Sequence, residues 1–179
     1  MKTLLLGLLA WSGLSQNANQ PVVDPQVLET RIFNAINAER TQRRLKPLKT
    51  DEKLTNLARV HSRDMARRVF FDHVNPDGKS PAQRARTAGL ECRRPLDDRY
   101  YLGLGENIFQ NNLYDRVIFR NDKPSYEWKS VDEIVKSTVE GWMNSPGHRQ
   151  VILTAGYLNT GVGVAVAPND QILITQEFC

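Results

Sequence analysis

The stretch GWMNSPGHR, residues 141–149, decides how the second half of this chain folds. Trp142 lies at helical spacing from the apolar residues that precede it, so we expect it to complete the buried face of one helix. Ser145 followed by Pro146 is typical of the start of another helix, because serine caps helix N-termini and proline fits the first helical position. The stretch therefore predicts two consecutive helices, with His148 in the first turn of the second.

On either side of this stretch, helical and strand patterns separate along the chain. Toward the N-terminus, capping residues and apolar spacing predict a helix from residue 25 to about residue 44, a second that begins at Thr50, and a short third over 81–89. Toward the C-terminus, Gly161–Ala167 and Gln171–Phe178 are typical of the two strands of a hairpin. Helices followed by a small antiparallel sheet predict a layered α+β fold.

Two further clusters, FFDH at 70–73 and GENI at 105–108, place His73 and Glu106 in turn-rich contexts. Together with His148 they offer two imidazoles and one carboxylate, a ligand set that Zn²⁺ accepts when water fills the fourth position. The same groups can transfer protons near neutral pH. None of the three lies one helical turn from another, so the sequence leaves the geometry of the site open.

The order and surroundings of these motifs resemble the CAP superfamily, also called SCP-like domains, and most of all its bacterial branch. The superfamily includes cysteine-rich secretory proteins, antigen 5 and pathogenesis-related 1 proteins. The resemblance runs from about Val27 to Phe178, and it implies a three-layer α-β-α sandwich with a small antiparallel sheet and a cleft on one side. The segments that carry it are LARVHSRDM at 57–65, FDH at 71–73, GENI at 105–108, GWMNSPGHR at 141–149, GVGVA at 161–165 and TQEF at 175–178.

The resemblance also implies a set of cleft residues. Eukaryotic members carry two histidines and two glutamates that can bind divalent metal, and His73, Glu106 and His148 match three of these four. The second glutamate falls near Ser145, where this chain has no carboxylate, and Glu140 is out of register. We therefore expect a triad in place of the tetrad, which weakens the case for a tight metal site.

Three interpretations of this triad stay open at the level of sequence. The side chains can serve structure alone, by hydrogen-bonding loop backbone and capping a helix. They can hold Zn²⁺ or another divalent metal weakly. They can also catalyse a reaction, although the triad lacks an obvious pair of nucleophile and base. Ser145 lies close to His148 in sequence, but as an N-cap its oxygen would be occupied.

Further polar residues are expected to support the cleft or the core. Asn107 and Ser145 lie beside candidate ligands, in positions from which they can orient them. Gln176 and Glu177 must lie on opposite faces of the last strand. One of them should face the core or the cleft, and we expect it to be Gln176, as a residue that supports the cleft, because a buried amide costs less than a buried charge. His61 lies on the apolar face of its helix and is expected to be a buried, hydrogen-bonded core histidine.

The N-terminus resembles a secretion signal over residues 1–18. Lys2 supplies its positive charge, and the apolar run over residues 4–14 is too short to span a bilayer. Residues 19–26 are then expected to form a linker, and residues 27–179 a single CAP domain, long enough to bury a hydrophobic core. No later segment is apolar for 18 residues, so after cleavage of the signal we do not expect an integral membrane protein.

The two cysteines, Cys92 and Cys179, agree with export. An even number of cysteines in an oxidising compartment predicts one disulfide, here between the segment after residue 90 and the last residue. We therefore expect an extracytoplasmic protein, either periplasmic or released from the cell.

Charge and composition limit the class of partner. The net charge is +4, and removal of Lys2 with the signal lowers it to +3. This excess comes without an aromatic or groove-fitting element, and export also argues against nucleic acid. A modestly basic surface is instead suited to anionic wall polymers or lipid head groups.

The sequence thus predicts an exported, non-catalytic binding module with a lipid, sterol, cell-surface or cell-wall ligand and a weak divalent-metal cleft. The alternative is a metal-dependent hydrolase or peptidase that uses His73, Glu106 and His148. The aromatic-rich segment Asn111–Lys129 either carries specificity or forms a surface insertion with its own apolar cluster. The fold alone decides none of these functions.

Overall fold

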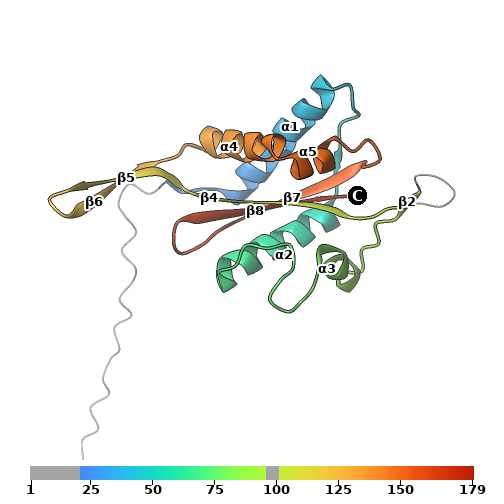
Figure 1. Ribbon diagram of the computed structural model, residues 1–179, viewed down its shortest axis with the longest axis horizontal. Coiled ribbons are helices and arrows are strands. Elements are labelled where there is room, and N and C mark those ends of the chain that lie inside the picture. Colours follow the sequence, from blue (N-terminus) through green and yellow to red (C-terminus); the bar gives the residue numbers. More distant parts are fainter. Residues whose placement is uncertain (1–20, 96–100) are drawn as a thin grey trace, which may run out of the picture.

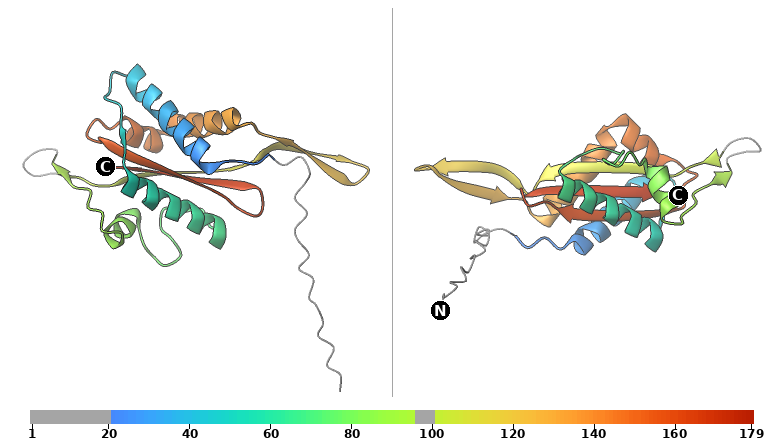
Figure 2. Two further views of the ribbon diagram at one scale, coloured as in Figure 1. Left: turned by 180° about the vertical axis from the view of Figure 1, so that it is seen from behind. Right: turned by 90° about the horizontal axis from the view of Figure 1, so that it is seen from below.

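The computed structural model describes residues 21–95 and 101–179, which form three layers (Figures 1 and 2). The predicted signal peptide, residues 1–18, lies outside the described residues. The helices are α1 (Pro25–Gln42), α2 (Glu52–Arg68), α3 (Pro81–Thr87), α4 (Val131–Asn144) and α5 (Pro146–Leu153). The strands are β1 (Lys49–Thr50), β2 (Arg94–Pro95), β3 (Tyr101–Leu102), β4 (Gly105–Asn112), β5 (Tyr114–Arg120), β6 (Lys123–Trp128), β7 (Asn159–Val166) and β8 (Gln171–Phe178).

The middle layer is a four-stranded sheet of order β1-β7-β8-β4. Strand β8 pairs antiparallel with both β7 and β4, as the hairpin pattern predicts, and the short β1 adds a parallel pairing with β7. Helices α1, α4 and α5 cover one face of this sheet, and α2 and α3 lie on the other (Figure 1). The predicted three-layer α-β-α sandwich is confirmed.

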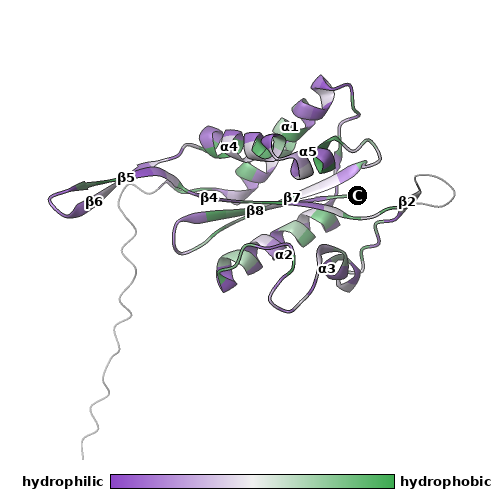
Figure 3. Cartoon of the chain, viewed as in Figure 1, coloured by the Kyte–Doolittle hydropathy of each residue, from purple (hydrophilic) through white to green (hydrophobic). Residues whose placement is uncertain are grey.

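The face toward α1, α4 and α5 carries the main apolar core. Alternate residues of β8, among them Ile172, Ile174 and Phe178, point into it and are fully buried. Trp142 of α4 fills the centre, and its indole N–H donates to the carbonyl of Ile108 at 2.9 Å. Hydrophobic residues therefore lie along the strands and the inner sides of the helices, while the outer helix surfaces are polar (Figure 3).

The opposite face packs closely against α2. A side chain at Gly161 or Gly163 of β7 would collide with the backbone of Thr55 and Arg59, so the glycines let helix and strand approach each other. A smaller apolar cluster, which includes Met65, fills the space toward the end of α2. These contacts hold the helix whose C-terminal end leads to the candidate site.

Helix boundaries follow local capping chemistry. Helix α1 begins at Pro25 because the Asp24 carboxylate accepts from the backbone N–H of Gln26 at 2.8 Å, so the last two residues of the predicted 19–26 linker are helical. Ser130 and Glu133 form a reciprocal capping box at the start of α4. Ser145, in contrast, makes no side-chain capping bond at the start of α5, and the prediction of an occupied cap oxygen there is wrong.

The predicted disulfide is present between Cys92 and Cys179, whose Cα atoms lie 5.5 Å apart. The two residues are 87 positions apart in sequence, and closing so long a loop stabilises the fold by about 4–5 kcal/mol in the chain-entropy model. Among the described residues, no helix is long and apolar enough to cross a membrane.

The predicted excursion between Asn111 and Lys129 is a β-hairpin. Its first two residues still belong to β4, and β5 and β6 then project from the body of the domain as a separate two-stranded sheet (Figures 1 and 2). At its base, Tyr114, Tyr126 and Trp128 pack on one another with ring centroids 5.1–6.2 Å apart. The hairpin therefore has the small apolar cluster of its own that the sequence offered as one of two alternatives.

Candidate functional site

The loop that follows α2 presents His73. The loop is held from below by His61, which is fully buried and whose Nε2 lies 3.0 Å from the carbonyl oxygen of Asp72. The Asp72 carboxylate also accepts from the backbone N–H of Val74 at 2.8 Å, which tightens the turn. The prediction of His61 as a hydrogen-bonded core histidine is confirmed, and its contact fixes the backbone beside His73.

Glu106 reaches His73 from the first residues of β4. One of its carboxylate oxygens lies 2.7 Å from Nδ1 of His73, and the other accepts from the guanidinium of Arg84. The same guanidinium donates to the carbonyls of His73 and Lys79, at 2.5 and 3.1 Å. Arg84 of α3 therefore ties together the loop, the helix and the strand that form the site.

A second carboxyl group lies behind Glu106. Glu177 of β8 is the cross-strand partner of Glu106 and is fully buried, and its Oε1 lies 4.0 Å from Arg84. Within the described part of the chain, neither oxygen of its carboxyl group has a hydrogen-bond partner. Burial, and then the charge of Glu106, raises the pKa of Glu177 well above its ordinary value. One buried arginine thus faces two carboxyl groups, of which Glu177 favours the neutral form.

The residues expected to support the cleft divide between the two faces of the sheet. Gln176 is buried, but its amide donates to the Thr160 hydroxyl at 3.1 Å on the face toward α1, α4 and α5. Gln176 thus faces the core, as the sequence predicted for one of the two residues, but Glu177 is buried as well and is the one that lies next to Glu106. Asn107 also points away from Glu106, and its amide donates to the backbone carbonyl of His148 at 3.1 Å.

His148 lies in the first turn of α5, as predicted, and is partly buried. Its backbone carbonyl is held by the bond from Asn107, and the charge of His73 contributes to lowering the pKa of His148. Ser145, the residue before α5, is also partly exposed. The structure thus brings His73 and Glu106 into direct contact, and links His148 to them through the electrostatic influence of His73.

The ionisation of the three groups follows from these contacts. The hydrogen bond with Glu106 raises the pKa of His73 above its usual value, against the effect of burial. Burial alone would raise the pKa of Glu106, but its bonds to neighbouring side chains, that to His73 foremost, and the charge of Arg84 bring it below the usual value. Burial, and then the neighbouring His73, lowers the pKa of His148. These contacts therefore favour the charged form of His73 and the neutral form of His148.

The fit of a divalent metal to these residues is limited. Both oxygens of Glu106 are engaged by His73 and Arg84, so the carboxylate supports an imidazole instead of offering a free ligand. In residues 21–95 and 101–179, no group of three or more histidine, cysteine or carboxylate side chains is arranged to hold a metal ion. The rings of His73 and His148 remain as candidate ligands, which is fewer than a tight zinc site uses.

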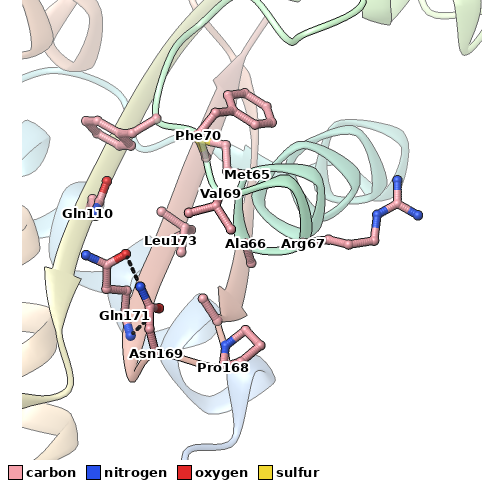
Figure 4. A pocket seen from close by; sticks show the side chains of 12 residues that line it. Met65, Ala66, Arg67, Val69, Phe70, Gln110, Pro168, Asn169, Gln171 and Leu173 are labelled. Atoms are coloured by element: carbon pink, nitrogen blue, oxygen red, sulfur yellow. Dashed lines mark hydrogen bonds between the residues drawn. The ribbon is translucent and has the colours of Figure 1, made fainter.

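A cavity of about 440 Å³ opens near the C-terminal end of α2, where the chain turns into the His73 loop (Figure 4). Met65, Phe70 and Leu173 form its apolar wall, and the amides of Asn169 and Gln171 lie on its rim (Figure 4). The rim also includes Val69 and Phe71, which leave 78% and 45% of their surface exposed. An exposed apolar surface thus lies on the segment that immediately precedes His73 in the sequence.

Sequence reasoning missed Arg84 and Glu177. Arg84 lies in a short helix whose start was predicted, but nothing in the sequence indicates that its guanidinium is buried against a strand 22 residues away. Glu177 was visible as the neighbour of Gln176, but a comparison of burial costs assigned it to the wrong face.

A three-layer sandwich with a histidine–glutamate pair at one end of its sheet defines a class of domain, and the sequence can be placed in it. Residues 33–178 match the profile of CAP, the cysteine-rich secretory protein family. The chain belongs to this family.

Two relatives from Bacillus subtilis (strain 168) match over 150 residues, or 84% of this chain. The uncharacterized protein YkwD is 33% identical and the uncharacterized membrane protein YlbC is 29% identical. The matched regions cover 46% and 34% of those proteins, so this chain spans less than half the length of either relative.

Solved structures share the fold at lower identity. An extracellular protein of Bacillus anthracis that contains an SCP domain superimposes with a TM-score of 0.59 at 23% identity, covering 86% of this chain and 40% of the other. An outer surface protein of Borrelia burgdorferi gives a TM-score of 0.61 at 15% identity, covering 87% of this chain and 94% of the other. These likenesses show the fold and leave the ligand open.

Proposed function

We propose that this protein is an exported CAP-domain binding module. The observation that carries the proposal is the exposed apolar rim at the Figure 4 cavity, on the loop that also presents His73. Val69 has a left-handed backbone (φ 54°), a conformation that costs a β-branched residue of order 1 kcal/mol. The chain therefore keeps an apolar side chain in water at an energetic cost, as ligand-binding surfaces do.

The chemistry of the cavity favours a lipid or sterol ligand, with a cell-wall polymer as the competing choice. Apolar walls with a few amide groups at the rim are typical of small-molecule sites of this size. The Cys92–Cys179 disulfide and the predicted signal over residues 1–18 support an extracytoplasmic location. Both ligand types occur there.

A binding assay with a matched control tests this proposal. The double variant Val69→Ser/Phe71→Ser should weaken retention on phospholipid–sterol vesicles by roughly tenfold or more, because each exposed apolar side chain gains about 1–3 kcal/mol when it is buried by a ligand. Phe119→Ser is the control, since Phe119 is 71% exposed at the distant β5–β6 hairpin. Equal retention of both variants would reject the loop as the binding surface, and retention on insoluble peptidoglycan alone would select the wall polymer.

Weak divalent-metal binding by His73 and His148 is part of the proposal. Its support is the proximity of two imidazoles, one of them neutral and the other oriented by Glu106. Titration of the chelator-treated protein with Zn²⁺ should raise the unfolding midpoint. At a hundredfold excess of Zn²⁺ over Kd, the free energy of unfolding should increase by about 2.7 kcal/mol. His73→Ala and His148→Ala should each abolish the rise. A midpoint that Zn²⁺ leaves unchanged would contradict metal binding.

A second candidate, a hydrolase or peptidase, is favoured by one observation. The His73–Glu106 contact of 2.7 Å is the arrangement by which a carboxylate orients a general base, and the Ser145 hydroxyl makes no capping bond. A screen of peptides and esters, with and without Zn²⁺, separates the two functions. Turnover that His73→Ala abolishes would establish an enzyme. No turnover of any substrate, together with retention on vesicles, would support the binding module.

A further inference from the structure

A second cavity, of about 400 Å³, lies between the N-terminal half of α2, the loop before α3, and α3 itself. It is separate from the Figure 4 cavity and shares none of its lining residues. Figure 2 shows α2 and α3 on the same side of the sheet, with the loop connecting them. The composition of its walls differs sharply from that of the first cavity.

The walls carry positive charge and no negative charge. Lys53, Lys79 and Arg84 all line the cavity, and no carboxylate does so among the described residues. Asp77, an acidic residue of the loop, already forms a two-bond pair with Arg68 at 2.8 and 3.0 Å. Neither lysine forms an ion pair with any side chain that the structure describes.

The floor is apolar and partly exposed. Leu57 is buried beneath the cavity, while Val60 leaves 54% of its surface open to solvent. Asn56, Asn75 and Thr87 add amide and hydroxyl groups at the wall. Cations around an apolar floor, with a few neutral hydrogen-bonding groups, complement a compact molecule that has one anionic group and an apolar body.

Arg84 links this cavity to the candidate site. Its side chain is only 7% exposed, its Nη atoms bind Glu106 and two loop carbonyls, and its Nε has no partner among the described residues. A buried guanidinium that keeps one N–H unbonded is unusual, because such groups are normally satisfied. The wall of the second cavity is thus formed by the same residue that orients Glu106.

We propose that the cavity between α2 and α3 binds a small amphiphilic anion, a carboxylate or phosphate monoester on a short apolar chain, with Lys53 and Lys79 holding the charged group. This site is distinct from the Figure 4 cavity and does not depend on the function proposed above. A ligand bound here contacts Arg84, and because Arg84 bonds Glu106 and the backbone carbonyl of His73, binding also changes the surroundings of those two residues.

Nuclear magnetic resonance titrations of the mature protein test the proposal with three probes of equal chain length: octanoate, octyl phosphate and octanol. We expect at least one of the two anions to shift the backbone amide signals of residues 53–60 and 84–88 at concentrations roughly tenfold below those that octanol needs. The two anionic arms distinguish a carboxylate ligand from a phosphate ligand.

The double variant Lys53→Met/Lys79→Met should weaken binding of the preferred anion by roughly tenfold and leave the octanol response unchanged. Both lysines are exposed, so the variant should retain the wild-type unfolding midpoint. Lys136→Met on α4 is the control and should bind as the wild type does. The proposal is overturned if octanol binds as tightly as the anions, if the double variant binds unchanged, or if no anion shifts these amides at millimolar concentration.

Discussion

The two faces of the central sheet bury side chains of different chemistry from the same strand. On the face toward α1, α4 and α5, strand β8 contributes Ile172, Ile174 and Phe178, all fully buried in an apolar core. On the face toward α2 and α3, the alternate residues run from Leu173 through Thr175 to Glu177, from apolar through hydroxyl to ionisable. The sheet therefore has one face for packing and another whose end forms the site.

The two faces differ in how they contribute to the stability of the fold. The apolar face gains stability from removing hydrocarbon from water, a contribution that does not depend on protonation. The polar face holds Arg84, Glu106 and Glu177 away from water, where the desolvation of charges offsets most of their attraction. Buried ion pairs of this kind add little net stability, so a functional role is a better explanation for them. Each of the following changes tests this contrast.

Removal of the buried cation should produce the largest effect. Arg84→Met leaves the Glu106 carboxylate buried without its main partner, and we expect the free energy of unfolding to fall by about 3–5 kcal/mol. Urea denaturation at neutral pH measures the loss. The control is Arg31→Met, which breaks the exposed pair with Asp132 and should cost less than about 1 kcal/mol. Equal losses in the two variants would show that the polar face contributes no more than a surface ion pair.

Glu177→Gln should change how stability depends on pH. The pKa of Glu177 is raised in the folded protein by burial and by Glu106, above its ordinary 4.5. The folded protein therefore holds this proton more tightly than the unfolded chain, and the contribution of Glu177 to wild-type stability falls as pH rises from about 4.5 through the folded pKa. The glutamine variant lacks this loss, so its stability relative to wild type should grow with pH.

Urea denaturation at several pH values between about 4 and 8 measures this difference. Glu140→Gln is the matched control, because Glu140 is an exposed carboxylate of α4 on the apolar side of the sheet. Its curve should run parallel to that of the wild type. A parallel curve for Glu177→Gln would mean that the buried carboxyl titrates normally and that the two faces do not differ in this respect.

The sequence predicted the apolar face far better than the polar one, for a physical reason. Helical spacing around Trp142 and alternation in the last strand are repeated signals, and each residue independently indicates the same buried side. Such repetition predicted a layered α+β fold and the C-terminal hairpin, whereas the three-layer arrangement was implied by the family resemblance and the disulfide followed from the even number of cysteines. Three-dimensional packing was needed to see that the second face of the sheet is also covered.

The site depends on individual side-chain contacts, which the periodicity of apolar residues in the sequence does not indicate. The choice of Gln176 over Glu177 compared the burial costs of isolated side chains and left out a cation supplied by α3 and a proton that neutralises the carboxyl group. The resemblance supplied His73, Glu106 and His148, but it placed the missing carboxylate at Ser145. A carboxyl group beside Glu106 instead comes from Glu177 of the adjacent strand, a residue of the matched TQEF segment that the resemblance did not assign to the cleft.

A small change in the apolar core should be independent of pH. Ile174→Val removes one methylene group from a fully buried position, and we expect a loss of about 1 kcal/mol. The loss should be the same at every pH used for Glu177→Gln, because the described side chains of this cluster are apolar apart from the Tyr157 phenol, whose pKa is raised by burial, and the buried Arg40 beside it stays charged throughout this range. Chemical denaturation over the same pH series gives the comparison, and a loss that varies with pH would show that the two faces are coupled through the sheet.

The smallest effect is expected at Ser145, on the helices that cover the apolar face. Ser130→Ala removes a side chain that bonds the Glu133 backbone at 3.2 Å and should cost about 1 kcal/mol. Ser145→Ala removes a hydroxyl with no capping bond at α5, so thermal unfolding should show a change of at most a few tenths of a kcal/mol. Equal losses would mean that Ser145 does cap α5, and its oxygen would then be unavailable to the cleft. A negligible loss would mean that the Ser145 hydroxyl does not stabilise α5. If Ser145→Ala then also alters ligand retention, Ser145 belongs to the binding surface.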